Sequence, residues 1–180
     1  LRHAEGDRIG LVAFAGSAFV QCPLTMDHAA AEIFLDDMDP DSTPVKGTSL
    51  GEAIKSALQA FDGGSSESRA IVLITDGEDH TGEAFKAAEQ AEKAGVRIFV
   101  IGIGRDEGAP IPNAEGGFRK DEHGQWILSK LDEPTLQRIA LTTHGKYVRS
   151  MMGDVDLKHI YEEGIKEDVK AREFASERRQ

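Results

Sequence analysis

The sequence predicts an α/β fold in which a mostly parallel sheet carries helices on both faces. Three continuous apolar runs, IGLVAFAG, RAIVLIT and VRIFVIGIG, are typical of strands that are buried on both faces. Between them lie stretches whose apolar residues recur at helical spacing. Strand-helix-strand units of this kind imply parallel pairing with right-handed crossovers. At 180 residues, the chain is long enough for one domain with a sizeable core.

The first two strands are expected to form an antiparallel pair. AFVQCPLT follows IGLVAFAG after a tight turn at Gly16 and Ser17, which places it at an edge of the sheet. Asp27 then supplies the oxygen that caps a helix. The apolar face of this helix is formed by Ala30, Ile33, Phe34 and Met38.

The central part of the chain alternates between helix and strand. A helix is predicted from about Ser49 to Phe61, because apolar residues recur there at helical intervals. RAIVLIT follows as a fully buried strand. The Ala-rich stretch GEAFKAAEQAEKAG is predicted as an amphipathic helix that stops at Gly95, and VRIFVIGIG is the next buried strand.

The regular alternation breaks between Gly108 and Lys130. GFRK and QWILSK flank DEHG, which predicts a hairpin with Gly124 at the position that needs a positive φ. This hairpin either contacts a partner or covers the edge of the sheet. Its Trp126 is the only tryptophan of the chain and is expected in the core.

The C-terminal third returns to helix and strand. Asp132 is expected to cap the helix EPTLQRIALTTH, Gly145 to close it, and KYVRS to form one more strand. A last helix and a tail with charges of both signs follow. The predicted division is a domain over residues 1–152, with a hairpin insert at about 108–131, and a C-terminal helix and charged tail over 153–180.

The composition argues against nucleic acid as a partner. With 21 Lys and Arg against 32 Asp and Glu, the formal charge is −11, which favours cations or basic surfaces over a phosphate backbone. Cys22 is the only cysteine, so the chain forms no internal disulfide and no zinc knuckle. No apolar run approaches the length of about 18 residues that suggests a membrane span.

An acidic turn follows the second buried strand. The stretch VLITDGEDH ends in Asp76, Glu78 and Asp79 before His80. Ligands of open α/β sheets bind beyond the carboxyl ends of the strands, which makes Asp76 a candidate site residue. Glu78 and Asp79 are interpreted as acids that favour the start of the next helix, where the helix dipole is positive.

A hydroxyl group is expected at the same edge of the sheet. KGTSLGEAI places Thr48 in a loop just before a helix, where Thr48 or Ser49 alone would be an ordinary helix cap. Together with Asp76 from a second loop, Thr48 offers hard oxygen ligands, which suit Mg²⁺ completed by water. The pair therefore indicates a metal site rather than a catalytic one.

Common enzyme motifs are absent from the sequence. It contains no G-x-x-x-x-G-K-[ST] or G-x-S-x-G element, and the glycines of GIGRDEG lack the dinucleotide-binding spacing. The six histidines show no H-x-x-x-H or H-E-x-x-H spacing, so each, including His80, is assigned a surface or loop role. A Rossmann-like phosphoryl-transfer enzyme, with Asp76 as nucleophile or metal ligand, is kept as an alternative.

Taken together, VLITDGEDH, KGTSLGEAI and GDRIGLVAFAG resemble the von Willebrand factor A (VWA) domain over roughly residues 6–150. This resemblance implies a Rossmann-like, doubly wound sheet and a non-enzymatic protein-interaction domain. The insert is similar to that of bacterial membrane-anchored VWA proteins of the aerotolerance (Bat) group. That similarity implies a parent protein in the bacterial cytoplasmic membrane, with this domain on the extracytoplasmic side. It also implies a role in aerotolerance, stress response or complex assembly, with other VWA proteins among the partners.

The VWA family holds Mg²⁺ or a similar divalent cation in a metal-ion-dependent adhesion site (MIDAS). A D-x-S-x-S motif after the first strand joins a Thr from a second loop and an Asp from a third, which leaves a position for an acidic group of a partner protein. By resemblance, Thr48 takes the second-loop role and Asp76 the third. No D-x-S-x-S occurs in this chain, so weak cation binding is expected. A VWA scaffold that binds no metal is a further alternative.

The resemblance also implies that the chain is truncated: it is expected to begin inside the first helix of the family and to lack the first strand with its D-x-S-x-S motif. That strand would lie between IGLVAFAG and RAIVLIT, so an open centre of the sheet is predicted. Some four buried side chains of such a strand contribute on the order of 10 kcal/mol. That rivals the ~5 to 15 kcal/mol that stabilises a domain. The chain alone is therefore expected to fold poorly or to leave two apolar strand edges facing a gap. In the parent protein, a transmembrane helix is implied soon after Arg178 and Arg179.

Overall fold

The structure is a computed structural model that describes residues 6–38, 47–61, 69–113, 116–150 and 154–170. The strands are β1 (Ile9–Phe14), β2 (Ala18–Thr25), β3 (Ala70–Thr75), β4 (Arg97–Gly102), β5 (Ala109–Pro110), β6 (Leu128–Ser129) and β7 (Tyr147–Arg149). The helices are α1 (His28–Asp36), α2 (Leu50–Ala60), α3 (Ala84–Lys93), α4 (Glu133–Thr142), α5 (Asp154–His159) and the π-helix η3 (Ile160–Lys166). The predicted tail that carries Arg178 and Arg179 lies outside the described residues.

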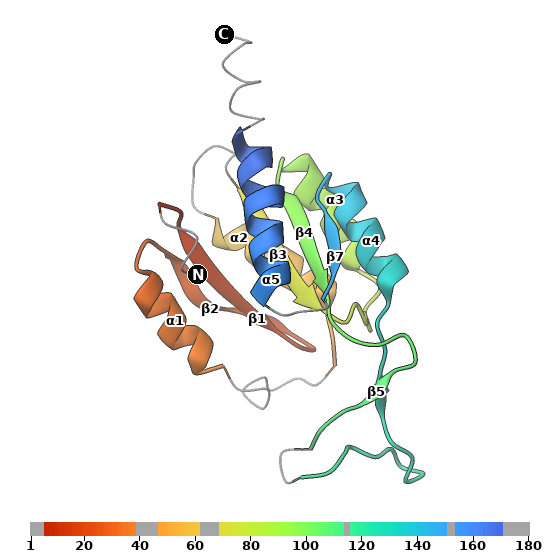
Figure 1. Ribbon diagram of the computed structural model, residues 1–180. Coiled ribbons are helices and arrows are strands. Elements are labelled where there is room, and N and C mark those ends of the chain that lie inside the picture. The colour runs from red at the N-terminus through yellow and green to blue at the C-terminus, as the bar shows by residue number, and fades with distance from the viewer. Residues whose placement is uncertain (1–5, 39–46, 62–68, 114–115, 151–153, 171–180) are drawn as a thin grey trace.

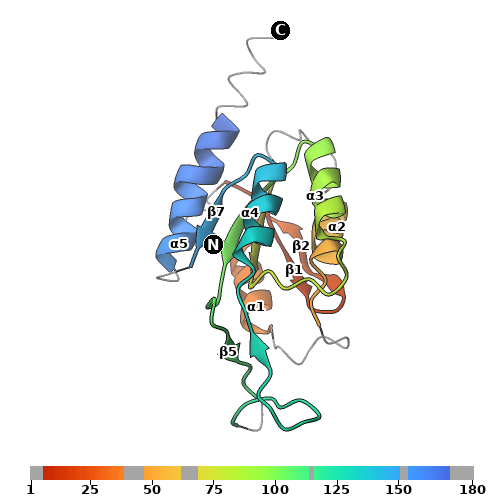
Figure 2. The same cartoon turned by 90° about the vertical axis from the view of Figure 1, so that its right-hand side faces the viewer.

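The predicted α/β class and its parallel pairing are confirmed. β3, β4 and β7 form a parallel sheet in the order β3-β4-β7, and β1 pairs with β2 in an antiparallel sheet. Figures 1 and 2 show α3 and α4 on one face of the parallel sheet and α5 on the other. Within the described residues no ladder of hydrogen bonds joins β1 to β3. The two strands that are predicted to flank an open centre are therefore in separate sheets.

Most predicted element boundaries agree with the structure, because local capping groups set them. Asp27 Oδ1 accepts a hydrogen bond from Ala30 N at 3.0 Å at the start of α1. Asp132 Oδ1 accepts one from Thr135 N at 3.2 Å at the start of α4. Gly95, with φ 70°, follows the end of α3 as predicted.

The C-terminal end of α4 differs from the prediction. His144, rather than Gly145, adopts the left-handed conformation there, with φ 57°. Gly145 is required for a different reason, because a Cβ atom at this position would lie 1.9 Å from the carbonyl oxygen of Ile98 on β4. The glycine therefore allows the turn between α4 and β7 to approach the backbone of the sheet closely.

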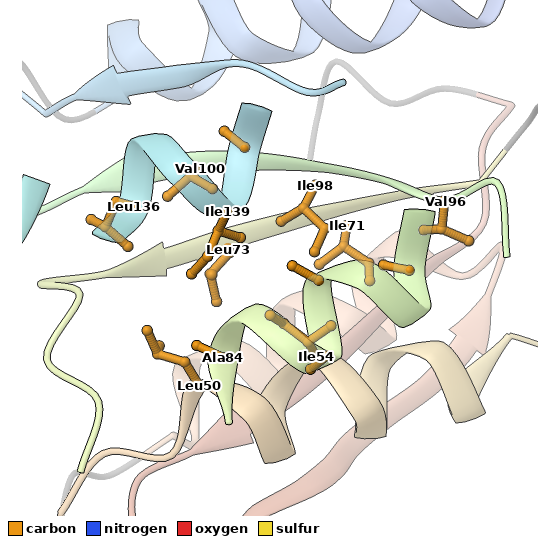
Figure 3. Close-up of a cluster of buried hydrophobic side chains, with 14 of the residues drawn as sticks. Leu50, Ile54, Ile71, Leu73, Ala84, Val96, Ile98, Val100, Leu136 and Ile139 are labelled. Carbon is orange, nitrogen blue, oxygen red and sulfur yellow. The ribbon is translucent and has the colours of Figure 1, made fainter. Parts of the chain in front are cut away.

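The main core lies between the parallel sheet and the helices α2, α3 and α4, as Figure 3 shows. Alternate residues of β3 and β4 face it: Ile71, Leu73, Ile98 and Val100. Leu50 and Ile54 come from α2, and α3 contributes the buried alanines Ala84, Ala87, Ala88 and Ala91. The small alanine side chains let α3 pack closely on its neighbours, as the amphipathic pattern predicts.

The opposite face of the parallel sheet is covered unevenly. Phe99 and Ile101 of β4 are buried against η3 together with Ile160. On β3, Val72 and Ile74 are 37% and 47% exposed. The prediction that RAIVLIT is buried on both faces is therefore wrong in this structure, because no described element packs over this half of the sheet.

The antiparallel pair is also less buried than the sequence predicts. Ala13 is the only buried residue of β1, and Ala31 is the only buried residue of α1. The predicted apolar face of α1 is exposed at Ile33, Phe34 and Met38. β1 and β2 form a two-stranded sheet, so each apolar side chain has fewer neighbours than it would have inside a larger sheet.

The predicted hairpin is present and projects from the body of the molecule in both views (Figures 1 and 2). Gly124 has φ 77°, and Asp121 N donates to Gln125 O at 2.8 Å. β5 pairs with β6 at the base of the insert, defined here as residues 108–131. Trp126 is 59% exposed, so its prediction as a core residue is wrong. The reason is that this hairpin extends away from the sheet instead of covering its edge.

Candidate functional site

Asp76 lies in the turn that follows β3, at the carboxyl end of the parallel sheet. Its Oδ1 accepts a hydrogen bond from Glu78 N at 3.1 Å, and its Oδ2 accepts one from Ser129 Oγ at 2.7 Å. Its carbonyl oxygen accepts a bond from Asp132 N at 2.8 Å. These bonds orient the half-buried carboxylate, while each of its oxygens keeps a lone pair for a further ligand.

Gly77 brings this turn against the start of α4. Its φ of 87° lies in the left-handed region, which glycine adopts without strain. A Cβ atom at this position would lie 2.8 Å from Leu136 Cγ and 2.9 Å from the carbonyl oxygen of Asp132. The glycine after Asp76 is therefore needed both for the conformation of the turn and for its packing.

Thr48 is joined to the same turn through His80. Thr48 N donates to His80 Nδ1 at 2.9 Å, and His80 N donates to Thr48 O at 3.0 Å. The Thr48 loop and the acidic turn therefore meet, as the sequence predicts for loops at one edge of the sheet. The histidine that joins them is exposed, and the sequence pattern assigns it only a surface or loop role. Its place in the same turn as Asp76 is the one local signal for this contact.

Ser49, the neighbour of Thr48, carries a buried hydroxyl group. Its backbone N donates to Ala15 O at 2.7 Å, which fastens this loop to the end of β1. Its Oγ has no hydrogen-bond partner within the described residues and does not cap α2. An unsatisfied buried hydroxyl costs about 1–3 kcal/mol, so a polar group bound beside Ser49 would recover part of that cost.

Glu78 and Asp79 differ in their roles, and only Asp79 follows the prediction. Asp79 Oδ2 accepts a hydrogen bond from Ala84 N at 3.2 Å, at the start of α3. Glu78 Oε1 instead accepts one from Lys130 N at 2.9 Å and so holds the base of the insert. The prediction of Glu78 as a helix-start acid is therefore wrong, because its carboxylate bonds to the insert and not to the start of α3.

The carboxylate of Asp79 links the starts of two helices. Burial tends to raise its pKa, but hydrogen bonds from the side chain and backbone of Thr81 outweigh that effect, together with bonds from the backbone of Ala84 and Leu50. The net result is a pKa below the ordinary value of an aspartate. Because Leu50 begins α2 and Ala84 begins α3, the carboxylate of Asp79 lies at the start of both helices.

The family model of the von Willebrand factor type A domain matches residues 3–163. The chain belongs to the VWA domain family. A solved structure of BatB from Bacteroides thetaiotaomicron is 39% identical, with a TM-score of 0.84 over 91% of this chain and 80% of that one. An aerotolerance-related membrane protein from Bacteroides fragilis is 36% identical, with a TM-score of 0.83 over 93% and 81%. The predicted VWA fold and the resemblance to Bat-type proteins are confirmed.

Curated relatives of this VWA domain are longer than the chain. A UPF0353 protein of Mycolicibacterium paratuberculosis is 32% identical over 168 residues, which are 85% of this chain and 46% of the relative. An uncharacterized protein of Borreliella burgdorferi is 37% identical over 108 residues, 57% of this chain and 30% of the relative. The chain thus spans less than half the length of these relatives. None of its described helices is both long enough and apolar enough to cross a membrane.

VWA domains generally mediate interactions without catalysis, and some carry a metal in a MIDAS motif. One structure of proximal thread matrix protein 1 from the mussel byssus has a zinc-occupied MIDAS motif; it is 20% identical to this chain and shares the fold, with a TM-score of 0.57. In the described part of the present chain, no three His, Cys, Asp or Glu side chains gather in a group that would hold a metal. The ligands that the sequence predicts are the hydroxyl of Thr48 and the carboxylate of Asp76, both of them oxygen donors. These two donors suit Mg²⁺, which takes oxygen ligands and retains water.

Proposed function

We propose that this VWA domain is a non-enzymatic protein-interaction domain that binds its partner through a divalent cation. Thr48 and Asp76 contribute ligands to the cation, and the partner contributes an acidic group. The observation that carries the proposal is the pair of hydrogen bonds between Thr48 and His80, which joins the two loops of the predicted ligands. When bound, Mg²⁺ or a similar cation supplies the positive charge that a carboxylate of the partner binds.

The chain's own residues prepare this site for a cation. Asp76 provides a negative charge whose orientation is fixed by Ser129 Oγ and Glu78 N, so little side-chain entropy is lost on binding. The backbone of Thr48 is held on both sides, by its N–H and by its carbonyl oxygen. The formal charge of −11 on the chain adds a field that attracts cations and disfavours an acidic partner in the absence of metal.

The proposed setting of the domain is a bacterial membrane-anchored protein of the Bat type. The similar structures of BatB and of an aerotolerance-related membrane protein support this setting. In it, the VWA domain lies on the extracytoplasmic side and acts in aerotolerance, stress response or complex assembly, with other VWA proteins among its partners.

The geometry gives less support to a phosphoryl-transfer enzyme that uses Asp76 as its nucleophile. Both carboxylate oxygens of Asp76 already accept hydrogen bonds from the chain, and such bonds lower the nucleophilicity of a carboxylate. These contacts argue against Asp76 as the nucleophile of such an enzyme.

The proposal is tested by calorimetric titration of the full gene product that contains this chain with MgCl₂ and MnCl₂. Asp76→Asn and Thr48→Val are each expected to weaken cation binding roughly tenfold or more. Asp76→Asn removes the negative charge and replaces one carboxylate oxygen by an amide nitrogen, Thr48→Val removes the hydroxyl oxygen, and both keep the size of the side chain. Asp36→Asn, at the exposed end of α1, is the control and is expected to leave the affinity unchanged. Residues 1–180 alone are expected to bind weakly.

Two results would contradict the proposal. If Asp76→Asn binds cations as tightly as the wild-type protein does, Asp76 is not a ligand. If the full gene product binds neither cation, the domain is a metal-free VWA scaffold. Micromolar Mg²⁺ binding to residues 1–180 alone, lost on Asp76→Ala, would show that Thr48 and Asp76 need no further ligands from outside this chain.

A further inference from the structure

The insert exposes an apolar surface on a part of the molecule that projects from the body (Figures 1 and 2). The rings of Phe118 and Trp126 lie with their centroids 5.7 Å apart and are 47% and 59% exposed. The neighbouring Ile127 and Leu128 are 40% and 43% exposed. Exposed aromatic and aliphatic side chains that gather on one segment are typical of protein interaction sites, where Trp and Tyr often dominate the binding energy.

The hairpin strand that carries this surface leads to the candidate cation site at the base of the insert. Ser129 Oγ donates to Asp76 Oδ2 at 2.7 Å, and Lys130 N donates to Glu78 Oε1 at 2.9 Å. Trp126 precedes Ser129 by three residues in a hairpin strand, which corresponds to about 10 Å of extended chain. An extended partner segment of about four residues therefore spans the distance between Asp76 and the aromatic pair.

The charge of the insert also suits an acidic partner. Residues 108–131 carry three Lys or Arg and three Asp or Glu, a net charge of 3 − 3 = 0, whereas the whole chain carries −11. Lys120 and Lys130 are exposed, and within the described residues neither forms an ion pair. An acidic segment is thus repelled by most of the molecule but not by the insert.

We propose that the insert is a second contact arm of the same interaction face. Its occupant is an extended segment of a partner protein that places a carboxylate on the cation at Thr48 and Asp76, and an apolar or aromatic side chain on the Phe118–Trp126 pair. This inference rests on the proposed function, because it assigns the chemistry of the partner of that site. The arm gives specificity, since a carboxylate alone is common to all acidic partners.

The test is a selection of phage-displayed random peptides of about twelve residues on the immobilised full gene product with MgCl₂. Peptides selected by the wild-type protein are expected to pair an acidic residue with an apolar or aromatic residue at a fixed short spacing. Peptides selected by Trp126→Ala are expected to keep the acidic residue but to show no preference for an apolar one. Peptides selected by Asp76→Asn are expected to lack the acidic residue. Leu141→Ala, which removes a 73% exposed leucine of α4, is the control and should select the same peptides as the wild type.

The outcomes separate this inference from the proposed function. If Trp126→Ala selects the same peptides as the wild-type protein, the insert is not a contact arm, and the proposed cation site is unaffected by this result. If the selected peptides carry no acidic residue and Asp76→Asn does not change them, the proposed function fails whatever the arm does. If no peptide is enriched on the wild-type protein, both fail.

Trp126 is the only tryptophan of this chain, and in the full gene product its emission is obtained as the difference between the wild-type protein and Trp126→Phe. A synthetic copy of a selected peptide, free of tryptophan, is expected to shift the emission of Trp126 to shorter wavelength, because binding removes the indole from water. Trp126→Ala is expected to weaken the binding of this peptide roughly tenfold or more, as measured by calorimetry. Trp126→Phe is expected to keep most of the wild-type affinity. An unchanged emission spectrum in the presence of saturating peptide would place the peptide elsewhere and overturn the inference.

Discussion

β3 and β4 have nearly the same kind of sequence and lie side by side in one parallel sheet, yet they differ in burial. In AIVLIT of β3, buried and less buried residues alternate, whereas every residue of RIFVIG after Arg97 is buried. The ladder pairs Ile74 with Ile101, which are the same residue type on the same face. Ile74 is 47% exposed and Ile101 is 4% exposed.

The difference comes from the neighbours of each strand and not from the strands themselves. β4 lies between β3 and β7, and η3 covers its second face with Ile160 and Gly164. Within the described residues, β3 pairs only with β4, and no helix packs over Val72 and Ile74. A continuous apolar run therefore shows that a strand is suited to burial on both faces, and the tertiary structure decides whether that burial is achieved.

The largest expected effect is a difference between Ile101→Ala and Ile74→Ala. Ile101→Ala should lower the free energy of unfolding by about 2–5 kcal/mol, because it leaves a cavity beneath η3. Ile74→Ala should cost about 1 kcal/mol, because roughly half of that side chain is already in water. Urea denaturation of both variants measures the contrast. Equal losses would show that an element absent from the described residues covers β3 in solution.

A smaller effect is expected where η3 contacts β4. A Cβ atom at Gly164 would lie 3.1 Å from Phe99 Cε1, and Phe99 is too deeply buried to move freely. Gly164→Ala should therefore cost about 1 kcal/mol, because overpacking outweighs the better helix propensity of alanine.

A double-mutant cycle with Phe99→Leu separates the contributions at this contact. The combined variant should be more stable than the sum of the two single changes predicts, because leucine makes room for the new methyl group. Strict additivity of the two changes in urea denaturation would refute close packing of η3 on β4.

The smallest expected change in stability is that of a substitution in the acidic turn at the end of β3. The pKa of Asp79 is lower in the folded protein than its ordinary value of 3.8. Its ionised form therefore stabilises the fold above that value, and the contribution is lost as the pH falls through the folded pKa. Asp79→Asn should lower the denaturation midpoint at about pH 7, and this difference from the wild type should shrink towards about pH 3. Asp36→Asn is the matched control, and a pH-independent effect of Asp79→Asn would rule out the ionic contribution.

Much of this fold is predictable from local sequence. The bounds of β2 follow AFVQCPLT, and Asp27 and Asp132 begin their helices, because capping and strand propensity act over a few residues. The exposure of Val72 and Trp126 is not predictable in this way. Burial depends on elements that are distant in the sequence, and an apolar residue has the same local pattern whether or not such an element covers it.

The candidate site is likewise predictable from the sequence only in part. Topology alone predicts that the loops of Thr48 and Asp76 meet at one edge of the sheet. The contacts of Thr48 with His80 and of Asp76 with Ser129 are not predicted. In each pair the two residues lie far apart in the sequence, and no motif of known spacing contains both. The same holds for Glu78, whose contact with Lys130 depends on where the insert folds back.

The uneven environment of β3 extends to its backbone. Successive residues of a parallel strand direct their amide groups to opposite neighbours, and Thr75 O accepts a hydrogen bond from Ile103 N on the β4 side. The amides of Ile71 and Leu73 therefore also face β4, while those of Val72 and Ile74 face away from it. In deuterated water, the amide protons of a single strand should exchange at two rates: quickly at Val72 and Ile74, and at Ile71 and Leu73 only when the sheet opens.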